Sequence, residues 1–149
     1  MAQQAGRASV MASDGFDSAR RMMDDFYAFR KLLGVRPRDI WMPPTDVYET
    51  PENVVIKMSV PGIRMADMRV MFNGDEIIIS GHRSAVHDAH VVAYHQLEIR
   101  TGLFERRVVV HKPIDPDGAT YEYTNGFLWV RVPKATAFVR RIVRIKLRG

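Results

Sequence analysis

Hydrophobic residues recur at two different spacings along the chain, and the spacing changes near residue 44. Between residues 14 and 33 they recur every three or four residues, the period of a helix with one apolar face. Gly34 is placed to end this helix, and prolines between Arg36 and Pro44 separate it from the next segment. We predict an N-terminal arm, residues 1–43, in which a disordered polar stretch precedes a helix over about 14–33. The apolar face comprises Phe16, Ala19, Met22, Met23, Phe26, Phe29 and Leu33.

From Asp46 onward apolar and polar residues alternate, which is the pattern of half-buried strands. The alternating runs stop at turn signals such as Pro61-Gly62, Asn73-Gly74-Asp75 and Asn125-Gly126. About seven or eight short strands, with a turn every 8–12 residues and no helices between them, are typical of an all-β sandwich. We therefore predict an immunoglobulin-like β-sandwich over residues 44–134. The clearest runs cover residues 54–60, 68–72, 76–80, 104–110, 121–123 and 128–132.

Residues 135–149 come after the last predicted strand and are expected to form an extended C-terminal tail. At a period of two, one edge of the tail is aliphatic and the other is basic. Helical spacing also fits the start of this segment, but it leaves Ile145 off the apolar face. The aliphatic edge comprises Val139, Val143, Ile145 and Leu147, and the basic edge comprises Arg140, Arg144, Lys146 and Arg148.

The 149 residues include 22 lysines and arginines and 17 acidic residues, which gives a net charge of +5. Residues 1–43 carry +2, residues 44–133 carry −3 and residues 134–149 carry +6, so the excess belongs to the tail. A basic tail attached to an acidic sandwich favours self-assembly that salt weakens. A basic-tailed nucleic-acid-binding protein is the alternative. Specific nucleic-acid recognition is not expected, because no aromatic residue is interleaved between Arg140 and Arg148.

Composition and motifs disfavour most catalytic chemistry. The chain has no cysteine, which excludes disulfides, thiolate nucleophiles and cysteine metal sites. It has no Gly-x-Ser-x-Gly, phosphate-binding glycine loop or His-Glu-x-x-His motif, so we expect neither an enzyme nor a cofactor. No apolar run approaches the roughly 18 residues that span a membrane, and residues 1–15 lack the apolar core of a signal peptide. A cytoplasmic location is therefore expected.

Histidines are concentrated in one part of the chain and raise two further hypotheses. His87-x-x-His90 has a spacing that suits a divalent metal, but solvated loop histidines are the favoured interpretation and no metal site is predicted. Histidines at an exchange interface would gain charge near pH 6–7, so assembly could depend on pH. The five are His82, His87, His90, His95 and His111.

Five segments with distinct motifs follow one another along residues 41–134. They are Trp41-Met42-Pro43-Pro44-Thr45-Asp46-Val47-Tyr48-Glu49-Thr50, Val60-Pro61-Gly62-Ile63, Ile78-Ile79-Ser80-Gly81-His82-Arg83, Gly102-Leu103-Phe104-Glu105-Arg106 and Asn125-Gly126-Phe127-Leu128-Trp129-Val130-Arg131-Val132-Pro133-Lys134. In this order they resemble motifs of the α-crystallin domain of small heat-shock proteins. The chain departs from that family's pattern at His82, Tyr121, Phe127 and Trp129, which makes one edge of the sandwich bulkier and more aromatic.

The resemblance implies an ATP-independent holdase chaperone that binds partly unfolded client proteins and assembles from homodimers into larger homo-oligomers. It implies a dimer-forming strand within the long loop between two sandwich strands, comprising Tyr94, His95, Gln96, Leu97, Glu98 and Ile99. It also implies that Val143-Arg144-Ile145 or Ile145-Lys146-Leu147 occupies a groove on a neighbouring subunit. A dimeric co-chaperone with one specific partner is a further alternative.

Other residues are assigned within this hypothesis. We expect Met and Phe side chains of the arm to contact clients, because such side chains adapt to varied partners, although the same face could pack on the chain's own domain. We expect Arg106 and Arg107 to form salt bridges between subunits. The groove would be lined by Val70, Phe72, Tyr121 and Tyr123, and the client-contact face by Phe16, Met22, Met23, Phe26, Phe29 and Leu33.

Overall fold

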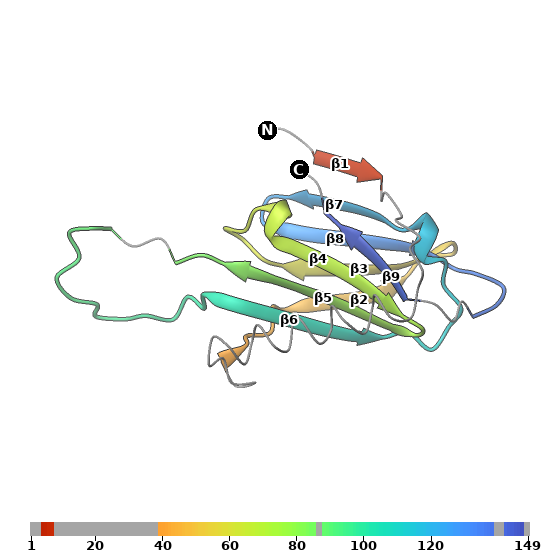
Figure 1. Ribbon diagram of the computed structural model, residues 1–149, viewed down its shortest axis with the longest axis horizontal. Helices are drawn as coiled ribbons and strands as arrows, with labels where there is room; N and C mark the ends of the chain where they lie inside the picture. The colour runs from red at the N-terminus through yellow and green to blue at the C-terminus, as the bar shows by residue number, and fades with distance from the viewer. Residues whose placement is uncertain (1–3, 8–38, 86–87, 139–141, 148–149) are drawn as a thin grey trace.

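The computed structural model describes residues 4–7, 39–85, 88–138 and 142–147. The helix expected over 14–33 lies outside these residues, and so does its apolar face from Phe16 to Leu33. Within the described residues the alternating runs form strands of two antiparallel sheets packed face to face (Figure 1). The β-sandwich predicted from the sequence is therefore confirmed.

One sheet has five strands in the order β1-β7-β8-β3-β2, and the other has four in the order β6-β5-β4-β9. A short 3-10 turn precedes β4 (Met65–Asp67), and another precedes β7 (Pro116–Gly118). The strands are β1 (Gln4–Arg7), β2 (Thr45–Glu49), β3 (Asn53–Ser59), β4 (Met68–Asn73), β5 (Glu76–Arg83), β6 (Gly102–Val109), β7 (Thr120–Thr124), β8 (Phe127–Pro133) and β9 (Ile142–Lys146).

The core lies between the two sheets and is built from alternate residues of each strand. Burying an aliphatic or aromatic side chain of this size contributes about 1.5–3 kcal/mol, so the alternation fixes which face of each strand turns inward. The five-stranded sheet contributes Val54, Ile56, Met58, Tyr121, Leu128, Val130 and Val132, and the four-stranded sheet contributes Met68, Val70, Phe72, Ile77, Ile79, Phe104, Val108, Val143 and Leu147.

Gly81 permits the close contact between β5 and β6. It pairs with Phe104, and a Cβ atom at residue 81 would lie 2.6 Å from the Phe104 ring and 2.6 Å from the Asp67 carbonyl oxygen. No side chain fits at such distances, so the glycine lets the Phe104 ring lie over the β5 backbone. Phe104 is completely buried as a result.

The Asn125-Gly126 turn forms as the sequence predicts. Both residues have positive φ, 50° and 80°, as a tight two-residue hairpin between β7 and β8 requires. The Val60 amide donates to the Gly126 carbonyl at 2.8 Å, so this hairpin also anchors the Pro61-Gly62 turn at the end of β3.

Two segments near the chain ends extend the sheets. Residues 4–7, for which the sequence pattern predicts no regular structure, form β1 and pair with residues 120–123 of β7. The tail forms β9, which pairs with β4 of the same chain. Without these two strands, β7 and β4 would be the outermost strands of their sheets.

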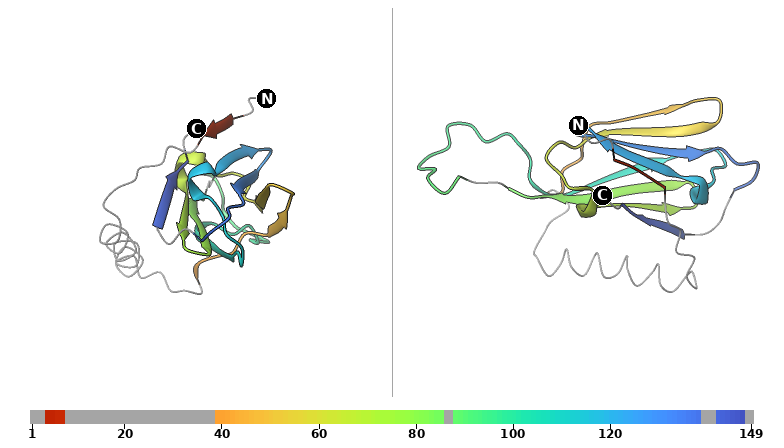
Figure 2. Two further views of the ribbon diagram at one scale, coloured as in Figure 1. Left: turned by 90° about the vertical axis from the view of Figure 1, so that its right-hand side faces the viewer. Right: turned by 90° about the horizontal axis from the view of Figure 1, so that it is seen from above.

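The segment between β5 and β6 projects from one end of the sandwich as a long loop (Figures 1 and 2). Its described residues, 88–101, form no strand, although the sequence predicts strand character for residues 91–99. An extended segment acquires strand hydrogen bonds only where it pairs with an open sheet edge, and residues 88–101 pair with no strand in the described part of the chain.

Among the described residues, the structure has no helix with the length and apolar character that a membrane span needs.

Candidate assembly and client-binding surfaces

The tail strand β9 lies along β4 in antiparallel register. Val143 is opposite Phe72, Arg144 is opposite Met71, and Ile145 is opposite Val70. Val143 and Leu147 are buried, at 5% and 1% exposed, and both belong to the core cluster. Partial burial lowers the pKa of the Arg144 guanidinium. Two residues of the predicted aliphatic edge, Val143 and Leu147, therefore face the core, and β9 occupies its own chain's β4.

The four residues predicted to line a groove come from β4 and β7, which lie in different sheets. Val70, Phe72 and Tyr121 are buried in the same core cluster as Val143 and Leu147, and Tyr123 packs against it. The Tyr123 hydroxyl donates to the Val60 carbonyl at 2.9 Å. The structure thus brings the predicted groove residues together with two of the predicted tail residues, Val143 and Leu147.

The residues predicted to form the dimer strand are strongly exposed. Tyr94 is 52% exposed, Leu97 70% and Ile99 77%. The outermost strand of the five-stranded sheet, β2, also carries exposed apolar side chains, since Val47 and Tyr48 are 46% and 45% exposed. Among the described residues, the segment 94–99 is exposed and apolar, and β2 pairs on one side with β3 and has no strand on its other side. Both features favour pairing with a second chain.

Arg83 joins the two ends of the projecting loop, at residues 83 and 100, which we call the loop neck. It ends β5, and its Nε donates to the Arg100 carbonyl at 2.7 Å, while its Nη2 donates to the same oxygen. Its Nη1 donates to the Pro61 carbonyl at 3.2 Å, and its guanidinium carbon lies 4.1 Å from the centroid of the Trp41 ring. Burial of this side chain lowers the pKa of Arg83.

Trp41 in turn lies along the start of β6. Its amide donates to the Leu103 carbonyl and its carbonyl accepts from the Glu105 amide, both at 3.2 Å. Its ring lies 5.3 Å from the Phe104 ring. In the sequence, Trp41 and Arg83 stand out only as family markers, since their contacts to backbone carbonyls leave no spacing pattern.

Arg107 and Arg106, predicted to bridge subunits, have different surroundings. Arg107 forms ion pairs within its own sheet, to Glu105 at 2.8 Å and to Glu76 at 3.2 Å. Arg106 is half-buried on the inward side of β6 and forms no ion pair with the described part of the chain. The structure therefore gives Arg107 partners within its own chain, and the predicted bridge from Arg106 to another subunit stays a prediction.

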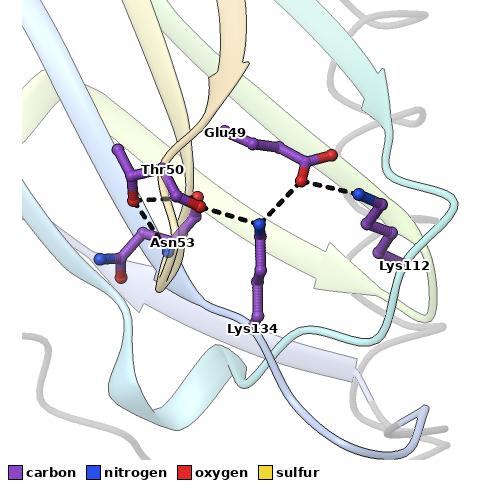
Figure 3. Close-up of polar contacts among 5 residues, drawn as sticks. All are labelled: Glu49, Thr50, Asn53, Lys112 and Lys134. Atoms are coloured by element: carbon purple, nitrogen blue, oxygen red, sulfur yellow. Dashed lines mark hydrogen bonds and ion pairs between the residues drawn. The ribbon is translucent and has the colours of Figure 1, made fainter.

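Glu49, at the end of β2, joins three parts of the sandwich (Figure 3). Its Oε2 lies 2.8 Å from Lys112 Nζ and 2.8 Å from Lys134 Nζ. The two lysine ammonium groups lower the pKa of the Glu49 carboxyl. Lys134 also donates to the Thr50 carbonyl at 2.8 Å. Because Lys134 directly precedes the tail, these contacts fix the point from which the tail leaves, which the sequence pattern does not predict.

Two of the three aromatic departures from the family pattern, Phe127 and Trp129, lie away from the groove, whereas the third, Tyr121, is one of the predicted groove residues and is buried. Phe127 and Trp129 occupy the outer face of β8, with ring centroids 5.6 Å apart. Lys57 Nζ lies 4.6 Å from the centroid of the Phe127 ring and 5.5 Å from that of Trp129. The bulkier surface predicted from these residues therefore belongs to the outer face of the five-stranded sheet.

Histidine and carboxylate side chains give no sign of a metal centre in the described ranges. These residues contain no group of three or more histidine, cysteine or acidic side chains placed to hold an ion. His87 lies outside the described residues, and the His90 amide donates to Asp88 Oδ1 at 2.9 Å in an ordinary loop turn.

Comparison with known proteins agrees with this architecture. Residues 46–146 match the Hsp20/alpha crystallin family. The 16.9 kDa class I heat shock protein 3 of Oryza sativa subsp. japonica is 31% identical over 105 residues, which are 70% of each chain. The structure of hspA from Xanthomonas axonopodis is 30% identical with a TM-score of 0.60, covering 65% of this chain and 97% of that one.

A small heat-shock protein from Xylella fastidiosa, whose crystal structure reveals a distinct high order structure, is also similar. It is 30% identical with a TM-score of 0.58, covering 66% of this chain and 91% of that one. The family match covers both sheets from β2 to β9, so this chain belongs to the Hsp20/α-crystallin family of small heat-shock proteins, a family of chaperones.

Proposed function

We propose that this protein is an ATP-independent holdase that keeps partly unfolded cytoplasmic proteins from aggregating and works as a dynamic homo-oligomer of dimers. The observation that carries the proposal is the position of β9. A segment near the chain end, attached by a short connection, covers the edge of β4 and buries Val143 and Leu147 beside Phe72. Such a contact can be released without unfolding the sandwich.

The same contact can link two copies. Two buried aliphatic side chains contribute roughly 3–6 kcal/mol before the cost of ordering the tail. β9 would make the same contacts on its own β4 or on that of a neighbour. Exchange between copies would therefore have a small free-energy cost, as long as residues 135–141 can span the distance to the neighbouring β4. Many such links in a closed assembly add avidity while each one stays weak.

Dimers would form through the projecting loop. Residues 94–99 would add as a strand to the open edge of β2 in a second copy and bury Tyr94, Leu97 and Ile99. The exposure of these side chains and of Val47 and Tyr48 supports this pairing, because exposed apolar groups close to an open edge favour strand addition. Arg106 is our candidate for an accompanying salt bridge.

Clients would bind the apolar surface that these exchanges uncover. When β9 leaves β4, Val70, Phe72, Tyr121 and Tyr123 would accept extended apolar segments, and burial of client surface needs no fixed sequence. The arm face from Phe16 to Leu33 is the second proposed contact. Heat would shift the population toward the uncovered state.

Light scattering and client turbidity together test the proposal. We would compare the full chain with a chain ending at Phe138, using heated citrate synthase as the client. The full chain is expected to form oligomers and suppress turbidity, and the shortened chain is expected to form dimers. A full chain that is monomeric and leaves turbidity unchanged would contradict the proposed function.

A further inference from the structure

One arginine connects the loop neck, a turn and the segment that leads in from the arm. Arg83 Nε lies 2.7 Å from the Arg100 carbonyl oxygen, where the projecting loop returns to β6, and Nη1 lies 3.2 Å from the Pro61 carbonyl oxygen. The guanidinium carbon of Arg83 also lies over the Trp41 ring, 4.1 Å from the ring centroid. Three segments distant in sequence therefore meet on one planar cation.

The geometry requires an arginine. A guanidinium presents several donors in one rigid plane and still offers its face to an aromatic ring, whereas an ammonium group cannot do both. Arg83 donates to backbone carbonyls at Arg100 and Pro61, so the interaction depends on backbone position and not on the side chains of the loop. Gly62 stands beside the arginine, and a Cβ atom there would lie 3.9 Å from Arg83 Cδ.

Trp41 provides the second half of the connection. Its amide and carbonyl hydrogen bonds to Leu103 and Glu105 attach the end of the arm, just before β2, to the start of β6. Its indole Nε1 also donates to the Gly102 carbonyl at 3.4 Å. Arg83 and Trp41 therefore hold the two ends of the loop and the root of the arm in one unit.

We propose that Arg83 is a positioning residue that couples the orientation of the projecting loop to the attachment of the N-terminal arm through Trp41. This inference rests on the proposed function, because the loop is there the dimer-forming element and the arm the client-contact element. When client binding or subunit release moves the arm, Trp41 shifts and the loop neck loosens. Dissociation of the dimer in turn weakens the attachment of the arm, because coupling between the loop and the arm acts in both directions.

Limited proteolysis gives a direct test of the neck, because the Arg100 carbonyl that Arg83 binds belongs to the bond that trypsin cleaves. Arg83→Lys keeps the charge but loses the planar contacts. It is expected to raise trypsin cleavage after Arg100 about tenfold, as loss of a charge-assisted hydrogen bond predicts. Chymotrypsin cleavage after Tyr94, in the middle of the loop, should stay unchanged.

A matched control and a coupling variant complete the test. Arg64→Lys alters an exposed arginine that pairs only locally with Asp67 and should change neither cleavage rate. Trp41→Leu should raise cleavage after Arg100 to a similar extent as Arg83→Lys, and Arg83→Lys should speed hydrogen exchange of the Trp41 and Glu105 amides.

Three results would overturn the proposal. The first is an unchanged rate of cleavage after Arg100 in Arg83→Lys. The second is an equal rise of the cleavage rates after Arg100 and Tyr94 in that variant, which would indicate general dissociation. The third is an unchanged rate of cleavage after Arg100 in Trp41→Leu. Light scattering of the same samples separates this failure from failure of the proposed function, because a wild-type chain that is monomeric and inactive against turbidity contradicts only the latter.

Discussion

Val143 of β9 lies opposite Phe72 of β4, and both side chains are buried between the sheets. The tail is thus part of the core, although it is a short strand at the chain end. In the proposed function the same strand also completes a neighbour's sandwich, which would link folding to assembly.

The first prediction concerns that contact. Val143→Asp would bury a carboxylate against Phe72, which should destabilise the contact between β9 and β4 by at least about 2–3 kcal/mol. We therefore expect β9 to detach from β4. The oligomer should lose mass in light scattering while the sandwich keeps its far-UV spectrum. Phe138→Asp is the matched control, because Phe138 is 57% exposed and precedes the strand. Equal masses for the two variants would argue against a link through the tail.

The second prediction concerns the projecting loop. Ile99→Asp removes an apolar group that is 77% exposed in the single chain, so the stability of the sandwich should change by no more than about 0.5 kcal/mol. Dimers should nevertheless dissociate at higher concentration than in the wild type, as analytical ultracentrifugation would record. Val92→Asp, which alters a fully exposed residue outside the 94–99 segment, should leave dimerisation unchanged. Identical behaviour of both variants would exclude the 94–99 strand from the dimer.

The third prediction concerns the contact between β5 and β6. Gly81→Ala places a Cβ atom 2.6 Å from backbone and ring atoms, so it should destabilise the fold by about 1–3 kcal/mol in urea unfolding. Gly74→Ala meets nothing within 4 Å and should cost only about 1 kcal/mol, because its φ is positive. Adding Phe104→Leu should relieve part of the Gly81→Ala defect. A smaller loss for Gly81→Ala than for Gly74→Ala would be inconsistent with the packing described.

The fourth prediction is a pH dependence. Lys112 and Lys134 lower the pKa of Glu49 in the folded state from its ordinary value of 4.5, so the carboxylate stabilises the fold above that pH. This contribution is lost as the pH falls through the lowered pKa. Glu49→Gln should therefore be less stable than the wild type in urea at pH 7, and the difference should shrink below pH 4.5. Glu52→Gln, which alters an exposed neighbour, is the matched control. A difference for Glu49→Gln that grows toward acid pH would refute the assignment.

The sequence predicts the sandwich well because its core depends on strict alternation. Runs 54–60 and 128–132 form most of β3 and β8 with the expected faces inward, and Val143 and Leu147 of the tail's predicted aliphatic edge are buried. These features result from the burial of every second side chain. This alternation is visible in the sequence of a single strand, without knowledge of the strands that pair with it.

Contacts made through the backbone leave no such trace in the sequence. Residues 4–7 form β1 through hydrogen bonds to β7, and Arg83 binds two carbonyl groups, so neither shows a side-chain pattern. Residues 94–99 have the composition of a strand but form none in the single chain, and we expect strand structure there only beside a partner's sheet edge. Whether the tail occupies its own β4 or a neighbour's is also independent of spacing, because both arrangements bury the same side chains.

Disulfide trapping in mixed subunits tests the central claim, that tails link copies of the chain, most directly. The chain has no cysteine, and Arg144 lies opposite Met71 in the β9–β4 register, so Met71→Cys and Arg144→Cys place two thiols within disulfide distance. The two single variants are mixed, equilibrated and oxidised, with each alone as the background control. The account predicts covalent dimers containing one chain of each kind. Absence of such dimers, with the double variant closing its bond only within one chain, would contradict it.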